Sequence, residues 1–216
     1  MSSSRRSRSR HIRRIVGNLI VALLALIALA LLVGLFLPRT YHVARSIDVK
    51  AGTEAIYPDL AGLRRWPEWT VWNKDLDPGI EWTYGSPDTG IGAEYSWVGP
   101  KVGDGRLKLV KADPEKGIAY ELSFQKDSMR SEGEISMEKV AGGVRVEWTN
   151  HGDLGKNPVN RYFGLLMDRM IGPDFEAGLR RLKERAERGA SSGVVTPSAT
   201  PPAPTQAPAA GSGSTN

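Results

Sequence analysis

Residues 118–125 read IAYELSFQ, and apolar and polar side chains alternate over most of this stretch. Successive side chains of a β-strand point to opposite faces, so the pattern predicts a strand with one face in the core and one in solvent. The face turned to the core would consist of Ile118, Tyr120, Leu122 and Phe124.

Similar stretches lie on both sides of this one, and turn residues close each of them. We expect further strands over 41–50, 80–84, 93–98, 106–112, 132–140 and 144–149. Short helices are expected after the first strand, over about 53–63, with Thr53 as the N-cap. Consecutive short strands joined by tight turns predict an antiparallel sheet with one covered face.

A helical pattern follows the last strand. Apolar residues recur at helical spacing over 160–171 and again over 175–186. Gly172-Pro173 should interrupt this helix, and Gly189 is a suitable end. The order of elements therefore predicts an α+β fold, in which a curved antiparallel sheet wraps around one long C-terminal helix and leaves a cavity between them.

Residues 15–37, from Ile15 to Leu37, are apolar enough to cross a membrane, and residues 19–37 have no charged or hydrogen-bonding side chain. About 20 apolar residues span the hydrocarbon core as a helix, which also satisfies every backbone polar group. We expect a transmembrane anchor. The alternative is a cleaved signal peptide, but its apolar region would be shorter, about 7–15 residues, and Ala28 and Ala30 lie in mid-run rather than at a cleavage site.

Residues 1–14 contain six arginines and no acid, which favours a cytoplasmic N-terminus and places the rest of the chain outside the cytoplasm, in the periplasm or at the cell surface. These arginines account for the net charge of +5, because without them 23 basic residues of the 29 face 24 acidic ones. The near-neutral remainder excludes nucleic-acid binding, despite the high pI. The absence of cysteine excludes disulfides, thiol catalysis and cysteine-based zinc sites.

The chain thus divides into a basic segment (1–14), the anchor (15–37), one domain (39–188) and a tail (189–216). The domain has about 150 residues, enough for a real core. The tail is uncharged and rich in Pro, Ala, Ser, Thr and Gly, a composition that predicts disorder.

Three motifs within the domain carry a family resemblance: WPEW at 66–69 with Trp72, GIGAEYSW at 90–97, and MDRMIGPDFEAGL at 167–179. With these the chain resembles the SRPBCC superfamily of START-like, helix-grip proteins, most of all the membrane-anchored bacterial members of its polyketide cyclase/dehydrase group. The resemblance covers about 41–188 and implies a helix-grip fold with a cavity for hydrophobic ligands. Val71 stands where similar sequences often have proline. No catalytic residue is carried over.

Few side chains suit catalysis. The three histidines, His11, His42 and His151, lack metal-site spacing, so no metal is expected. Gly90-x-Gly92 lacks the rest of a dinucleotide motif, no nucleophile elbow or phosphate loop occurs, and no cofactor is expected. The candidates for acid–base chemistry are His151, Glu94 and Asp168. The simpler interpretation is a surface turn for His151 and a charge on the helix surface for Asp168.

Aromatic and methionine side chains are the expected lining of the cavity, since they suit a ligand of ill-defined shape. Alternation alone does not distinguish such a lining from a filled core. The candidate residues are Trp66, Trp69, Trp72, Trp82, Tyr84, Tyr95, Trp97, Tyr120, Phe124, Met137, Trp148, Phe163, Met167 and Met170.

Two functions of different classes follow, and the sequence favours the first. The first is a membrane-tethered binding module for lipid or another hydrophobic small molecule. The second is a cyclase- or hydrolase-like enzyme, with a third possibility in an envelope scaffold that acts through its tail. The sequence names no ligand, protein partner or oligomeric state.

Overall fold

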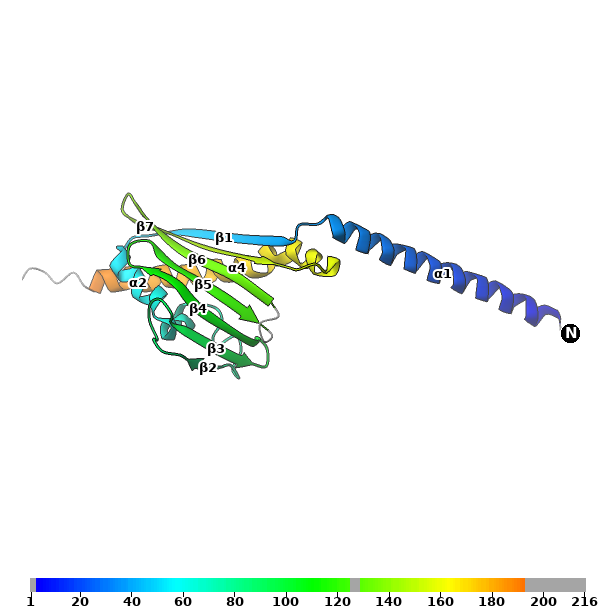
Figure 1. Ribbon diagram of the computed structural model, residues 1–216, viewed down its shortest axis with the longest axis horizontal. Coiled ribbons are helices and arrows are strands. Elements are labelled where there is room, and N and C mark those ends of the chain that lie inside the picture. The colour runs from blue at the N-terminus through cyan, green and yellow to red at the C-terminus, as the bar shows by residue number, and fades with distance from the viewer. Residues whose placement is uncertain (1–2, 125–128, 193–216) are drawn as a thin grey trace, which may run out of the picture.

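The computed structural model describes residues 3–124 and 129–192. Figure 1 shows a long N-terminal helix that projects from a sheet-and-helix domain. The elements are α1 (Ser3–Phe36), β1 (Thr40–Val49), α2 (Thr53–Ala61), η1 (Leu63–Arg65), α3 (Trp66–Trp69), β2 (Glu81–Tyr84), β3 (Glu94–Gly99), β4 (Gly103–Asp113), β5 (Gly117–Phe124), β6 (Met129–Val140), β7 (Gly143–Asp153) and α4 (Pro158–Ser192). The predicted tail lies outside the described residues from position 193 onward.

The seven strands form one antiparallel sheet in the order β1-β7-β6-β5-β4-β3-β2. The sheet curves, and α4 runs along its covered face (Figure 1). This confirms the α+β helix-grip fold with a long C-terminal helix. Strands β4, β6 and β7 extend beyond their predicted ends where turn residues still pair, most of all β7, which continues to Asp153 opposite Thr40.

The short helix α2 starts at Thr53, but Gly52 rather than Thr53 occupies the N-cap position, and no side chain caps it. The Thr53 hydroxyl instead donates a 3.4 Å hydrogen bond to Glu115 Oε1, beyond the end of β4. The N-cap prediction was wrong because this tertiary contact engages the hydroxyl that would have capped the helix.

Helix α4 is continuous through Pro173, so the predicted interruption at Gly172-Pro173 is not found. Arg45 of β1 spans this site: its Nη1 donates to Asp168 Oδ1 (2.7 Å) and its Nε to Glu176 Oε1 (2.7 Å), one carboxylate on each side of the proline. Gly172 lets the guanidinium lie close, because a Cβ there would be 2.1 Å from Arg45 Nη2. These contacts hold both halves of the helix against β1, which offsets the hydrogen bond that proline removes.

The same helix also passes Gly189 and ends at Ser192. Gly189 was predicted to end it, but a glycine inside a helix costs only about 1 kcal/mol relative to alanine. That cost is small enough for a long helix to continue through it.

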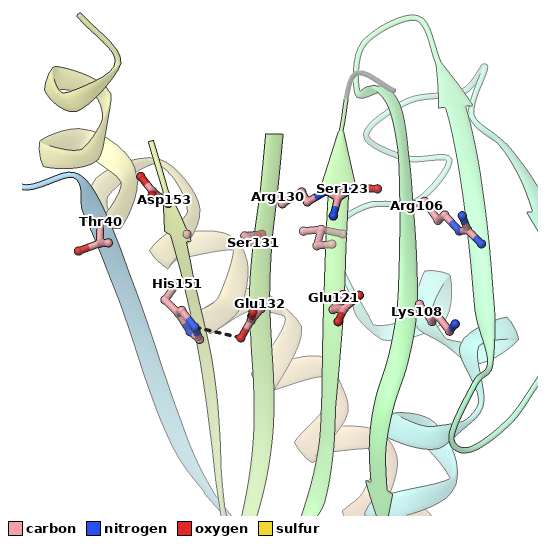
Figure 2. A pocket seen from close by; sticks show the side chains of 12 residues that line it. Thr40, Arg106, Lys108, Glu121, Ser123, Arg130, Ser131, Glu132, His151 and Asp153 are labelled. Atoms are coloured by element: carbon pink, nitrogen blue, oxygen red, sulfur yellow. Dashed lines mark ion pairs between the residues drawn. The ribbon is translucent and has the colours of Figure 1, made fainter. Parts of the chain in front are cut away.

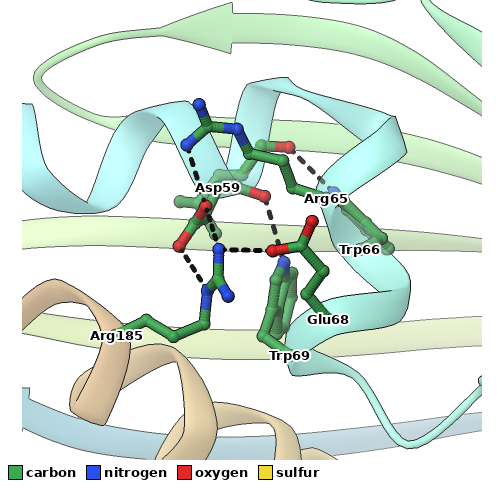
Figure 3. A network of polar contacts seen from close by, with 7 residues as sticks. Asp59, Arg65, Trp66, Glu68, Trp69 and Arg185 are labelled. Atoms are coloured by element: carbon green, nitrogen blue, oxygen red, sulfur yellow. Dashed lines mark hydrogen bonds and ion pairs between the residues drawn. The ribbon is translucent and has the colours of Figure 1, made fainter.

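An ion-pair network joins α2, α3 and the end of α4 (Figure 3). The Asp59 carboxylate, 6% exposed, accepts hydrogen bonds from Arg185 Nε (2.9 Å) and Arg65 Nη1 (3.2 Å). The indole nitrogens of Trp66 and Trp69 donate to the carbonyl oxygens of Leu60 (3.0 Å) and Asp59 (3.1 Å). The tryptophan motif is therefore fixed in place, and its first two indoles are buried in the core.

Helix α1 contains one stretch, Val16–Phe36, that is long and apolar enough to cross a membrane or to serve as a signal sequence. Its last turns pack against the start of α4. Arg161 Nη1 donates to the carbonyl oxygen of Leu35 (2.6 Å), and the Tyr162 hydroxyl donates to that of Ala30 (2.6 Å). The helices approach closely at Gly34, where a Cβ would lie 2.7 Å from the Pro158 carbonyl oxygen.

Candidate ligand cavity

A cavity of about 230 Å³ lies between the sheet and α4. Its surface is mostly apolar. Nine of the predicted residues line it: Trp66, Trp72, Trp82, Tyr95, Trp97, Tyr120, Phe124, Trp148 and Met167. The other lining residues are Tyr41, Ile80, Val102, Leu107, Leu122, Ser131, Asn150, Ile171 and Phe175.

The cavity occupies the end of the domain nearest α1. Tyr41 of β1 is opposite Gly152, and the same row continues through Ser131 to Leu122 and Leu107 on successive strands. Because β1 begins at Thr40, shortly after the end of α1, this row of paired residues lies at the end of the sheet closest to that helix. Side chains fill the other end of the domain as an apolar core, which includes Val49, Ile56, Leu60, Leu109, Ile118, Ile135, Val144 and Leu182.

Aromatic rings make the wall of the cavity rigid. Trp148 and Phe175 stack in parallel with centroids 4.2 Å apart, and Trp72 meets Phe175 edge-on at 6.2 Å. Trp66 meets Tyr120 edge-on at 5.5 Å. Interlocked rings of this kind hold their rotamers, so the cavity has a defined shape before a ligand enters it.

Five predicted lining residues lie elsewhere. Trp69 is fully buried behind the wall, with its ring 5.2 Å from that of Trp148. Met137 packs into the filled end of the core, and Tyr84 lies under the Arg64 guanidinium, 4.5 Å from its carbon, near the edge of the sheet. Phe163 and Met170 point away from the sheet and are 53% and 58% exposed. The strand and helix patterns place a residue on a face but do not show whether that part of the face borders a cavity, and on α4 the predicted set combined Met167, which lines the cavity, with two exposed residues.

Polar groups in the cavity gather on one wall. The Tyr41 hydroxyl donates to Asn150 Oδ1 (2.9 Å), and Asn150 Nδ2 donates to Ser131 Oγ (3.4 Å). Nearby, Trp148 Nε1 donates to the Tyr120 hydroxyl (2.8 Å). We call Tyr41, Ser131 and Asn150 the polar cluster. Buried polar groups of this kind can orient the polar end of a bound molecule.

Burial raises the pKa values of the Tyr41, Tyr95 and Tyr120 hydroxyls, because the phenolate would be poorly solvated there. All three therefore remain neutral at physiological pH. Among the described residues that line the cavity, none is a carboxylate, histidine, lysine or arginine. The lining can bind and orient a molecule, and its ionisable groups are phenols held in the protonated form.

None of the three acid–base candidates lines the cavity. Glu94 pairs with Arg106 (2.6 Å) and Asp168 with Arg45 (2.7 Å). His151 Nε2 lies 3.3 Å from Glu132 Oε2 on the face of the sheet that is turned away from α4 (Figure 2). That outer face is hollowed to about 590 Å³, but residues of both charge signs line the hollow without a dominant sign. Within residues 3–124 and 129–192, no group of three potential metal ligands occurs.

The pairing of Asp168 with Arg45 predicts a pH dependence of stability. The hydrogen bonds from Arg45 lower the pKa of the Asp168 carboxyl below its usual value. A carboxyl with a lowered pKa stabilises the fold above its unfolded pKa, about 3.9, and this stabilisation is lost as the pH falls through the folded pKa. Asp168→Asn should therefore lower the melting temperature at neutral pH, and this difference should shrink as the pH falls below about 3.9. Thermal melts across this range test it, and a pH-independent difference would contradict it.

The polar cluster was not predicted from the sequence. Tyr41 begins the predicted strand over 41–50 but was not counted as a lining residue. Asn150 is two residues after Trp148, so continuing the alternation by one step would have placed it on the inner face. Ser131 likewise lies four residues before Ile135 on β6, but a small polar side chain gives no apolar signal.

Residues 40–187 match the protein family described as "Polyketide cyclase / dehydrase and lipid transport". No curated protein matches the chain in sequence. Among solved structures, the di-domain ARO/CYC StfQ from the steffimycin biosynthetic pathway is similar with a TM-score of 0.53 and 14% identity, over 70% of this chain and 52% of that one. This similarity concerns the fold alone.

Two further structures show weaker similarity. The Aha1 dimer from Colwellia psychrerythraea gives a TM-score of 0.48 at 19% identity, over 68% of this chain and 97% of that one. Ara h 8.0201 gives 0.47 at 14% identity, over 71% and 99%.

Proposed function

Because the chain belongs to the polyketide cyclase/dehydrase and lipid transport family, we propose that it is a membrane-tethered module that binds lipid or another hydrophobic small molecule between its sheet and α4. The observation that carries this proposal is the cavity itself, a mostly apolar space with one polar wall. Pockets for hydrophobic ligands combine these two features, because the apolar surface provides affinity and a few polar groups set orientation.

Helix α1 supports the proposed tether. Val16–Phe36 spans about 31 Å as a helix, the thickness of a hydrocarbon core. The arginines before it favour a cytoplasmic N-terminus, with the domain and the tail outside the cytoplasm. The cavity is in the end of the domain closest to this helix, so tethering would hold it where hydrophobic molecules are concentrated.

The polar cluster supports a ligand with one polar end. In this arrangement the apolar part of the ligand packs on the rings of Trp97, Trp148 and Phe175, and its polar end meets Tyr41 and Asn150. A cyclase-like reaction is the alternative that the family leaves open. It would have to proceed without the three acid–base candidates, which face away from the cavity.

The test is native mass spectrometry of residues 39–216, produced without α1 and purified without detergent. We expect a defined extra mass that organic solvent releases and that can be identified as a lipid or another hydrophobic molecule. A chain that carries no extra mass, and gains none when a lipid extract is added, would contradict ligand binding.

The polar cluster gives a second expected result. Tyr41→Phe removes the hydroxyl that bonds to Asn150 and leaves the ring in place. Loss of the hydrogen bond that the Tyr41 hydroxyl would make to the polar end of a ligand costs about 1 kcal/mol, so such a ligand should bind about five-fold more weakly. Titration monitored by tryptophan fluorescence measures this change. Tyr57→Phe, at a tyrosine outside the lining, is the matched control and should leave the affinity unchanged.

A further inference from the structure

Exposed apolar side chains gather at the end of the domain that faces α1. Val98 lies at the end of β3, beside the turn into β4, and the Leu76 carbonyl accepts a hydrogen bond from Lys101 in that turn. Val159, Phe163 and Leu166 lie on the first turns of α4. We call these five residues the proximal face. Each is between 43% and 66% exposed, which is costly for so many large apolar groups in water.

Three of these residues form a stripe on α4. Val159, Phe163 and Leu166 are spaced by four and three residues, so they lie on one side of the helix. Met167, which lines the cavity, is four residues after Phe163 and therefore adjoins the stripe. The apolar surface is continuous from the outside of α4 toward the cavity lining.

Contacts with α1 determine the depth of the proximal face along the axis of that helix. The Tyr162 hydroxyl bonds to the carbonyl oxygen of Ala30, which is six residues, or about 9 Å, before the end of the apolar stretch at Phe36. Arg161 donates to the carbonyl oxygens of Leu35 and Leu37 and so caps the end of α1. If α1 crosses the bilayer, the first turn of α4 lies beside the last part of the apolar stretch, at the boundary between the hydrocarbon core and the lipid headgroups.

The arrangement of the elements is consistent with this depth. In Figure 1 the start of α4 lies beside the end of α1, and the end of α4 lies at the opposite end of the domain. Lys101 and Lys156 belong to the loops at the proximal end, where ammonium groups suit anionic headgroups.

We propose that the proximal face is a bilayer-contact surface, whose apolar side chains insert among the lipid headgroups beside α1. This inference rests on the proposed membrane tether. The contact would bury the exposed stripe and place the neighbouring cavity lining next to lipid. A second copy of the chain or another protein on this face would be a different outcome of the test.

The absence of cysteine allows a direct experiment on the full-length chain. Single cysteines at Phe163→Cys and Val98→Cys are labelled with an environment-sensitive fluorophore. The protein is reconstituted in vesicles of phosphatidylethanolamine and phosphatidylglycerol that contain a doxyl lipid, with the doxyl group near the headgroup in one sample and near the end of the acyl chain in a second. Ile91→Cys, 65% exposed in the turn between β2 and β3, is the matched control, and Leu26→Cys reports on α1 itself.

We expect the doxyl lipid to quench the labels at 163 and 98 strongly, and aqueous iodide to quench them weakly, with the reverse at 91. If iodide quenches the labels at 163 and 98 as strongly as it quenches the label at 91, while lipid quenches the label at 26, the bilayer contact is overturned. The tether is then left intact. Protection from both quenchers would show that protein covers the face and would also overturn the bilayer contact. A label at 26 without lipid quenching would overturn the tether and the contact together. Melting curves of each variant confirm folding.

Discussion

Leu122→Trp combined with Ile171→Trp should abolish ligand binding while the domain stays folded. The two side chains line the cavity from opposite walls, Leu122 from β5 and Ile171 from α4. Two indoles would occupy the space that a ligand needs. Overpacking of a filled core costs about 1–3 kcal/mol, but here the added atoms enter an existing cavity, so the cost should fall below that range. Native mass spectrometry of residues 39–216 should show the bare chain.

The matched control places the same indoles on the outside. Ser123 is next to Leu122 on β5 but faces the outer hollow (Figure 2), and Arg180 is exposed on α4. Ser123→Trp with Arg180→Trp should retain the bound mass. If the cavity-filled variant melts like the wild type and still carries its ligand, the binding site is elsewhere on the chain and the proposed function fails.

Asp59→Ala should lower the free energy of unfolding by about 2–4 kcal/mol. Removal of one member of a buried ion pair costs about 3–5 kcal/mol, because the partner charge loses its compensation. We reduce that figure because the Arg185 side chain is 27% exposed and Arg65 is more exposed still, so water screens part of the loss. Chemical denaturation of residues 39–216 measures the change. The effect should be on stability, since none of these residues lines the cavity.

Glu68→Ala is the control for this prediction. Glu68 Oε2 lies 2.7 Å from Arg185 Nη2, but its side chain is 53% exposed. Exposed ion pairs contribute at most about 1 kcal/mol, so this substitution should change stability little. Equal losses for Asp59→Ala and Glu68→Ala would mean that burial of the Asp59 carboxylate has no special part in joining α2 to α4.

The strand patterns predicted the sheet and the face of each strand well, because alternation follows directly from strand geometry. Trp97, Tyr120 and Trp148 were placed inside, and all three line the cavity. The same reasoning placed Met137 with them, although it lies in the filled end of the core. Alternation carries no information about where along a strand the packing against α4 becomes incomplete, and that depends on the tertiary structure.

Helix α4 carries two apolar stripes in its first half, and this limited the helix prediction. Met167 and Ile171 belong to the stripe that faces the sheet, whereas Phe163 and Met170 belong to the exposed one. A helix packed in a core usually has one apolar stripe, so the sequence pattern merged the two. The inward side of the helix is shown by the burial of Phe175, Leu179 and Leu182 and by the contacts of α4 with Arg45 of β1.

The same sheet forms both the filled end and the cavity end of the domain, and over evolutionary time the two ends can tolerate substitutions differently. The end around Ile56, Ile135 and Leu182 is filled by a continuous apolar core, whose burial contributes to the folding free energy. Side chains around the cavity have empty space on one side and can vary in size at a lower cost. The domain can therefore acquire a new ligand preference by substitutions at the cavity end without first gaining stability elsewhere.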